Sequence, residues 1–316
     1  MIGNDIHIAA ELLKSGKNVA IPTETVYGLA GNAFNPDAVI GIFEIKKRPL
    51  FNPLIAHIGN WEMAERLSSG IPEVLRQLAL NFWPGPLTIL LPKSDLVHDV
   101  VTAGSPNVAI RMPDHKITLE LLQLLDFPLA APSANTFGGI SPTTALHVEQ
   151  QLGNAIPYIL DGGACSVGVE STIIRSNTAN KIEILRPGGI SAEMLALQLG
   201  YRPDIITHSA IPVAPGMLKS HYAPVIPLIV GDITELLASY ADKKVGILSF
   251  YKAFEHPSII QSEQLSLNGE LHEAARNLFA AMRRLEVSGA EIILAENVPN
   301  HGIGIAINDR LSRASA

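Results

Sequence analysis

Short apolar runs alternate with amphipathic segments along most of the chain. Runs of strand length are followed by turn residues or Pro, which cannot donate to a strand ladder. They lie at residues 19–21, 54–56, 87–91, 108–113, 127–131, 158–163, 169–174, 228–230, 245–250 and 290–295. Apolar residues at helical spacing predict helices over residues 4–16, 61–67, 72–81, 191–199, 233–240 and 271–286. This alternation predicts an α/β protein whose first part has a mixed sheet.

The clearest local signals surround a helix predicted from residue 36. Asn35 is a capping residue, and Pro36 is favoured at the first helical position. The helix ends in a cationic cluster, Lys46 to Arg48, and Pro49 stops it. Cations in a last turn offset the helix dipole, so the cluster can be purely structural. In either case we expect a solvent-facing helix end.

A change of pattern divides the chain. Residues 204–227 are rich in Pro and have little periodicity, which predicts an ordered linker. We therefore predict a first domain over 1–203, a linker over 204–227 and a second domain over 228–316. Strands and helices alternate in the last of these, which predicts a small parallel α/β domain.

The composition of the 316 residues narrows the class of protein. Hydrophobic residues make up 47% and charged residues 17%, and the formal net charge is −7. No global basic field is available for nucleic acid. The single cysteine, Cys165, excludes an intrachain disulfide and predicts a reducing compartment; we expect it to be buried and inert. No apolar run has the length of a membrane helix, so we expect a cytoplasmic protein.

The common catalytic motifs are absent. The chain has no GxxxxGK[ST] loop, HExxH, CxxC or GxSxG. Hydroxyl, amide and cationic side chains instead stand at strand ends and helix starts, where anions are often bound. These residues are Lys46, Arg48, Arg111, Ser133, Asn135, Ser141, Ser171, Thr172 and Arg186. Alternatively, Ser141 is a plain helix N-cap, and the arginines are solvated surface residues.

Several longer motifs resemble one family in their order along the chain. They are PTETVYGL at 22–29, KxRP at 46–49, NPLxxH at 52–57, PSAN at 132–135, GxEST at 168–172 and RPG at 186–188. This set resembles the YrdC-like family, and the ending GIGIAINDR at 302–310 resembles the extra domain of its long form. The resemblance implies a YrdC-like mixed twisted sheet with helices, followed by a smaller Rossmann-like parallel α/β domain.

The resemblance also implies an activity, L-threonylcarbamoyladenylate synthesis. Such an enzyme makes threonylcarbamoyl-AMP and pyrophosphate from L-threonine, bicarbonate and ATP, for threonylcarbamoyladenosine in tRNA. Mg²⁺ would be carried by the ATP phosphates without protein ligands, and a tRNA-modifying transferase complex would act downstream. The implied catalytic residues are Lys46 and Arg48. The implied ATP-binding residues are Lys46, Arg48, Asn52, Ser133, Asn135, Ser141, Arg186 and Tyr222. The implied threonine-binding residues are Thr25, His57, Arg111 and Ser171.

Two questions stay open at this point. Tyr222 belongs to the linker, which we expect to fold over the cleft as a lid; the alternative is that Tyr222 packs at the domain interface.

The rival function is a non-catalytic module that binds tRNA or double-stranded RNA. The net charge of −7 argues against that rival and predicts no strong nucleic-acid binding. A carbamoyl-transfer maturation factor is disfavoured too, because one cysteine cannot build a cysteine-based zinc finger.

Overall fold

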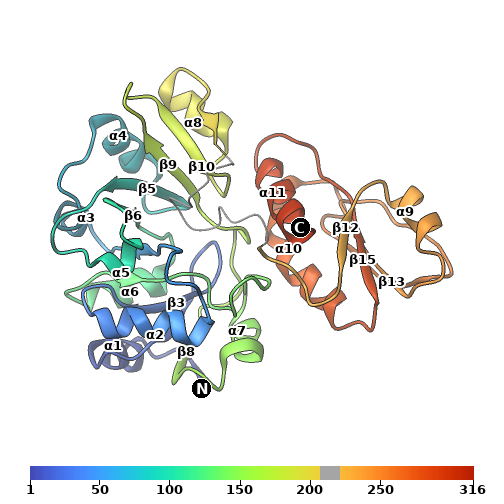
Figure 1. Cartoon of the computed structure of the whole chain (residues 1–316), viewed down its shortest axis with the longest axis horizontal. Coiled ribbons are helices and arrows are strands. Elements are labelled where there is room, and N and C mark those ends of the chain that lie inside the picture. The colour runs from blue at the N-terminus through green and yellow to red at the C-terminus, as the bar shows by residue number, and fades with distance from the viewer. Residues whose placement is uncertain (207–220) are drawn as a thin grey trace.

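A large and a small sheet organise the computed structural model, which describes residues 1–206 and 221–316. The large sheet is followed by residues 207–220, which lie outside the described part and include Pro212, Pro215 and Gly216 of the predicted linker. Figure 1 shows the two parts as neighbouring bodies, with α10 (Leu271–Glu286) and α11 (Gly304–Ala314) on the side that faces the large one. The predicted domain boundaries stay predictions.

The large sheet has eleven strands and is mixed. Its spatial order is β1 (Ile2–Gly3), β8 (Tyr158–Leu160), β2 (Val19–Ile21), β3 (Gly28–Asn32), β7 (Leu129–Ala130), β4 (Ile55–His57), β6 (Asn107–Arg111), β5 (Leu87–Pro92), β9 (Thr172–Ser176), β10 (Ile182–Arg186) and β11 (Asp204–Ile205). Its helices are α1 (Ile6–Lys14), α2 (Pro36–Lys46), α3 (Trp61–Leu67), α4 (Glu73–Phe82), α5 (Asp99–Thr102), α6 (Lys116–Gln123), α7 (Ala145–Leu152) and α8 (Ala192–Leu199). The parallel pair β4 and β6 lies near its centre and ends at the site described below.

The small sheet is parallel throughout. Its order is β12 (Leu228–Val230), β15 (Ile292–Ala295), β13 (Val245–Ser249) and β14 (Ile259–Gln264). Helix α9 (Ile233–Ser239) lies on the outer side in Figure 1, whereas α10 and α11 lie toward the large domain. This arrangement confirms the fold class, a mixed α/β domain followed by a small parallel one.

Local signals account for many of the observed elements. The Asn35 side chain accepts from the backbone N–H groups of Asp37 and Ala38, and Ser191 caps α8 in the same way. The prediction that Ser141 caps a helix is wrong. Helix α7 begins at Ala145 and is capped by Thr144, because the Ser141 hydroxyl instead donates to Glu170 Oε1 at 2.6 Å. The sequence patterns also missed β3, β10, β14, α6 and α11, and the short elements β1, β11 and α5.

The two domains share a hydrophobic core. Val26, Ile140 and Val169 of the large domain belong to the same buried cluster as Phe279 and other residues of α10. Gly168 marks the tightest approach: a Cβ atom there would lie 2.3 Å from Arg276 Cα and 2.6 Å from the Ala275 carbonyl oxygen. The Arg283 guanidinium of α10 also donates to the Ile140 carbonyl. Helix α10 is therefore packed against the loop that leads to Glu170.

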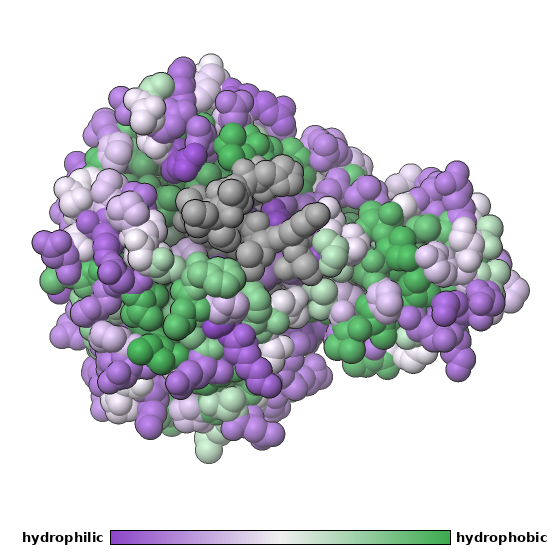
Figure 2. Space-filling view, in the orientation of Figure 1, coloured by the Kyte–Doolittle hydropathy of each residue, from purple (hydrophilic) through white to green (hydrophobic). Residues whose placement is uncertain are grey.

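Hydrophilic side chains dominate the face of the molecule seen in Figure 2. Figure 2 shows hydrophilic side chains over most of the visible face of both domains, with hydrophobic side chains in smaller patches between them. None of the helices in the described part of the chain is long and apolar enough to cross a membrane.

The packing at Gly168 predicts a costly substitution. Its φ is +80°, so Ala loses about 1–2 kcal/mol from the left-handed backbone, and overpacking against α10 adds about 1–3 kcal/mol. Gly104 is a matched control, because its φ is +78° and a Cβ atom would meet nothing within 4 Å. In denaturant melts, we expect Gly168→Ala to lose at least about 1 kcal/mol more than Gly104→Ala. Equal losses would show that α10 does not constrain this loop.

Candidate active site

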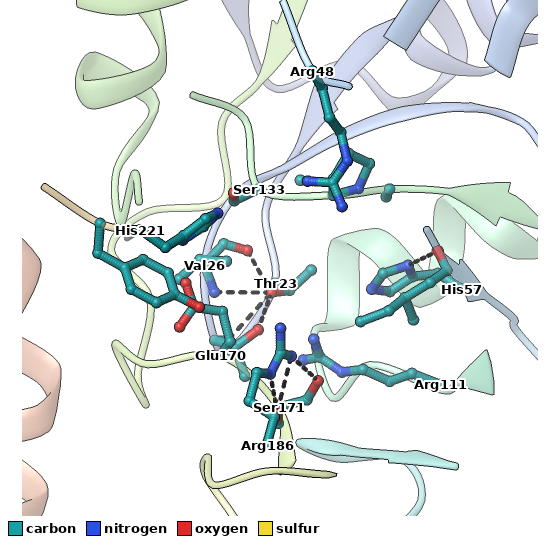
Figure 3. Close-up of a pocket in the computed structure, with 16 residues that line it drawn as sticks. Thr23, Val26, Arg48, His57, Arg111, Ser133, Glu170, Ser171, Arg186 and His221 are labelled. Atoms are coloured by element: carbon teal, nitrogen blue, oxygen red, sulfur yellow. Dashed lines mark hydrogen bonds between the residues drawn. The ribbon is translucent and has the colours of Figure 1, made fainter. Parts of the chain in front are cut away.

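A buried pocket lies where the carboxyl ends of β4 and β6 meet the loops that follow β2 and precede β9. Figure 3 shows Arg48, His57, Arg111 and Arg186 reaching it from separate segments. Many predicted site residues line it: Thr25, Arg48, His57, Arg111, Ser133, Ser171, Arg186 and Tyr222. The structure therefore brings both predicted groups, for ATP and for threonine, to one place.

His57 and Arg111 are neighbours because of strand register. They are paired at the ends of the parallel strands β4 and β6, where ligands often bind α/β sheets. Burial, reinforced by the Arg111 charge, lowers the pKa of His57 to about 3, so its ring is neutral. Arg111 itself contacts a carboxylate, since its Nη2 lies 2.7 Å from Glu24 Oε1. Its Nε donates to the Gly85 carbonyl at 3.3 Å.

Ser171 and Arg186 meet because β9 and β10 are antiparallel. Ser171 precedes the start of β9, and Arg186 ends β10. The Arg186 guanidinium donates to the Ser171 carbonyl at 2.9 Å and to its hydroxyl at 3.0 Å. Ser171 also hydrogen-bonds the Thr88 hydroxyl at 2.7 Å. These contacts fix both side chains at the pocket wall.

Thr23 shapes the loop that carries Thr25. Its hydroxyl donates to the Val26 carbonyl at 2.6 Å and accepts from the Thr25 and Val26 backbone N–H groups at 3.2 Å. Such side-chain turns let a hydroxyl residue organise the backbone locally. The Thr25 hydroxyl, 2.8 Å from that of Thr23, is held against the pocket in consequence.

The cations after α2 are buried, so the expectation of a solvent-facing helix end is wrong. Lys47 takes the left-handed conformation, with φ of 52°, and turns the chain inward at Arg48. Lys46 is 1% exposed and donates to the Ser133 and Asn135 carbonyls, both at 2.5 Å. Arg48 is 7% exposed and donates to the Asn52 and Pro53 carbonyls at 3.2 and 2.9 Å. The dipole-offset interpretation does not explain charges buried so deeply.

Burial also changes the acidity of these two groups. Burial, with a contribution from Arg48, holds the pKa of the Lys46 ammonium well below its usual value. Burial lowers the pKa of Arg48 to about 9. Neither cation has a carboxylate within ion-pair distance in residues 1–206 and 221–316. The described side chains therefore pair no carboxylate with Arg48, which lines the pocket, or with Lys46, which lies behind its wall.

Four predicted residues lie one contact behind the pocket wall. Lys46 reaches it through the Ser133 carbonyl, and Asn52 through its own carbonyl, which accepts from Arg48. The Asn52 amide is fully buried, and within the described residues neither its oxygen nor its nitrogen has a hydrogen-bond partner. Asn135 contacts Lys46, and Ser141 contacts Glu170. These four residues support the pocket wall from behind and do not line the pocket.

The second domain contributes to the site through Arg310 of α11. This side chain is fully buried, and its Nε lies 2.8 Å from Glu170 Oε2. Burial would raise the pKa of Glu170, but Arg310, Arg186 and the Ser141 hydroxyl together keep it below its usual value. Tyr222 packs between the domains, with its ring 5.6 Å from Phe279 and 5.2 Å from the Arg310 guanidinium.

Tyr222 thus fits parts of both earlier interpretations. It lies in the shared core, as the interface alternative required, and it also lines the pocket. His221 lines the pocket beside it, and burial lowers the pKa of that imidazole to about 3. Linker residues 207–220 lie outside the described residues, so the lid hypothesis stays a prediction.

Sequence reasoning did not assign Glu24, Glu170, His221 or Arg310 to the site. Glu24 and Glu170 stand inside the PTET and GxEST motifs, and Arg310 ends the GIGIAINDR segment. The available signals were the acidic residues between predicted ligand contacts and the arginine that ends the second domain's motif. Cys165 is buried, as expected, and burial raises the pKa of its thiol to about 12.

Two protein-family models match the chain, one on each side of residue 189. The Sua5/YciO/YrdC model, described as telomere recombination, matches residues 11–188. The model of the C-terminal domain of threonylcarbamoyl-AMP synthase matches residues 190–316.

Full-length relatives agree with both models. Threonylcarbamoyl-AMP synthase from Pyrococcus abyssi is 43% identical, over 98% of this chain and 94% of its own length. The Bacillus subtilis enzyme of that name is 40% identical, over 99% of this chain and 94% of its own length. The crystal structure of P. abyssi Sua5 complexed with L-threonine matches with a TM-score of 0.93 and 42% identity, covering 100% of this chain and 97% of that one. The chain therefore belongs to the Sua5/YrdC family and, within it, to the two-domain threonylcarbamoyl-AMP synthases.

Proposed function

We propose that the buried pocket makes threonylcarbamoyl-AMP and pyrophosphate from L-threonine, bicarbonate and ATP. The observation that carries this proposal is that the cations at the pocket fall into two groups on different walls. Lys46 and Arg48 are held by backbone carbonyls, so their charges are available to a polyanion. Arg111, on another wall, is paired with Glu24 and stands beside the neutral His57 and Thr25. The first group suits the phosphates of ATP, and the second suits an amino acid.

The chemistry needs no covalent enzyme intermediate. Bicarbonate loses hydroxide to give CO₂, the threonine amine attacks the carbon of CO₂, and loss of an amine proton gives a carbamate, so that water is the by-product. A carbamate oxygen then attacks the α-phosphorus of ATP, and the bond to pyrophosphate breaks. The protein's contribution is to orient the reactants and to stabilise charge on the phosphates with groups already in place. Lys46 and Arg48 would act on that charge, and Ser133, Asn135, Asn52, Ser141, Arg186 and Tyr222 would support the nucleotide.

Threonine would bind on the opposite wall. The Arg111 guanidinium is suited to its carboxylate, since two N–H groups of the same fork can donate to both oxygens. Thr25, His57 and Ser171 line the pocket near this group and offer neutral hydrogen-bonding atoms to the rest of the amino acid. A neutral His57 does not compete with Arg111 for the carboxylate.

Magnesium would be carried on the ATP phosphates, where it neutralises charge. The residues present fit this arrangement, because the buried carboxylates of Glu24 and Glu170 are already engaged by Arg111 and Arg310. Phosphate oxygens and water are common Mg²⁺ ligands in such sites. We further propose that the product is passed to a tRNA-modifying transferase complex in the cytoplasm.

Substrate dependence is the direct test of the proposal. We expect pyrophosphate release from ATP to require both L-threonine and bicarbonate, measured by a coupled assay with each omitted in turn. Release at the full rate without threonine would contradict the assignment. Strongly salt-dependent tRNA binding without ATP turnover would instead favour the RNA-binding function.

The buried cation Lys46 can be compared with its exposed neighbour Lys47. Lys46→Met removes the charge with little change in volume, and we expect kcat/KM for ATP to fall about 100-fold because phosphate stabilisation is lost. The lost hydrogen bonds lower the free energy of unfolding, whereas removal of a buried charge raises it. The free energy of unfolding should therefore change by no more than about 2 kcal/mol. Lys47→Met should leave both quantities unchanged. Equal effects of the two substitutions on turnover would exclude a special role for Lys46.

Replacement of Arg111 tests the threonine wall. Lys carries the charge but lacks the planar fork that can contact Glu24, the Gly85 carbonyl and a ligand together. We expect Arg111→Lys to raise KM for threonine at least about tenfold and KM for ATP much less. Steady-state kinetics with each substrate varied would show the difference, and Arg175→Lys, in a half-exposed pair with Glu183, is the control. A defect confined to ATP would move Arg111 to the phosphate side.

A further inference from the structure

Glu24 is a buried carboxylate for which the reaction described above has no use. Its side chain is 5% exposed, and it does not line the pocket. The 2.7 Å ion pair with Arg111 is its compensating contact, and neither carboxylate oxygen has a hydrogen bond to another described residue. Its backbone carbonyl accepts from the Val167 N–H at 2.7 Å, which holds the backbone that carries this carboxylate. A charge buried at this depth needs its partner.

The pairing makes Arg111 electrostatically unlike Lys46 and Arg48. Among the described residues, Lys46 and Arg48 contact neutral carbonyls and no carboxylate, whereas Arg111 and Glu24 form a pair of zero net charge. An uncompensated buried guanidinium attracts the most highly charged anion available. In this pocket that anion would be a phosphate group of ATP or pyrophosphate, and it would compete with the single carboxylate of an amino acid.

We infer that Glu24 makes the Arg111 subsite selective for a zwitterionic amino acid over phosphate anions. It does so through Arg111 and touches no substrate, so it is a positioning and selectivity residue. Glu24 reduces the net positive charge that the subsite presents while it leaves the guanidinium able to donate to one carboxylate. The polyanion is thereby directed to Lys46 and Arg48, and the two substrates occupy separate walls. This inference rests on the proposed binding of threonine at Arg111.

Competition between threonine and inorganic pyrophosphate tests the inference. Threonine binding is measured by calorimetry without ATP, at rising pyrophosphate concentrations. In the wild-type protein, the threonine Kd should change less than about twofold, because the two ligands use separate subsites. In Glu24→Gln, which keeps the shape and removes the charge, pyrophosphate should raise the apparent Kd about tenfold, because Arg111 becomes an unpaired cation. A purely structural role for Glu24 would produce no such competition.

Further variants keep the experiment decisive. Glu183→Gln removes a carboxylate that pairs with Arg175 and does not line the pocket, and it should behave as wild type. If Glu24→Gln does not fold, Glu24→Asp keeps the charge but withdraws it from Arg111, and competition should be intermediate. Insensitivity to pyrophosphate in the folded Glu24 variants, or competition already present in the wild type, would overturn the inference. If the wild type binds no threonine, the proposed function itself fails, and that result is distinct from normal binding with unchanged selectivity.

Discussion

Burial of charge around one pocket is the constraint on which most of this structure depends. Removing an ion from water costs several kcal/mol unless another group compensates it. The chain uses two kinds of compensation: carboxylates for Arg111 and Arg310, and backbone carbonyls for Lys46 and Arg48. The carbonyls come from the PSAN and NPL segments, so these loops must hold fixed shapes. The backbone turns around the pocket are thus a consequence of its electrostatics.

The same constraint ties the second domain to the first. Glu170 lines the pocket and is compensated by Arg310, which comes from the helix before the C-terminus. Removing Arg310 would leave Glu170 with the Ser141 hydroxyl and the nearby Arg186 charge, and removing Glu170 would leave Arg310 paired with Asp309 alone. The close approach of Gly168 to α10 and the shared apolar core hold the two groups in register. The pocket is therefore electrostatically complete only when both domains are in place.

Sequence patterns predicted the elements that nearby residues specify, and they failed where a contact with a residue distant in the chain determines the structure. The periodicity over residues 271–286 and the capping at Asn35 specify helices without outside help, and both agree with the structure. Ser141 has the local chemistry of an N-cap, but the buried carboxylate of Glu170, far along the chain, draws its hydroxyl away. Likewise, nothing near Lys46 indicates that the helix end is covered by residues 133–139. The family motifs named many residues that line one pocket, whereas their pairing by charge needed the fold.

The two kinds of compensation have different consequences when ligands arrive. Carbonyl dipoles orient Lys46 and Arg48 but carry no net charge, so a polyanion proposed to bind near them would not have to displace a carboxylate. An ion pair such as Arg111–Glu24 offers much less net charge, so what binds there must be selected by hydrogen-bond geometry. Both sets of groups are held before ligand binding, and little reorganisation is needed as charge develops on the phosphates. A pocket that is costly to maintain when empty is for that reason well suited to stabilise a phosphoryl-transfer transition state.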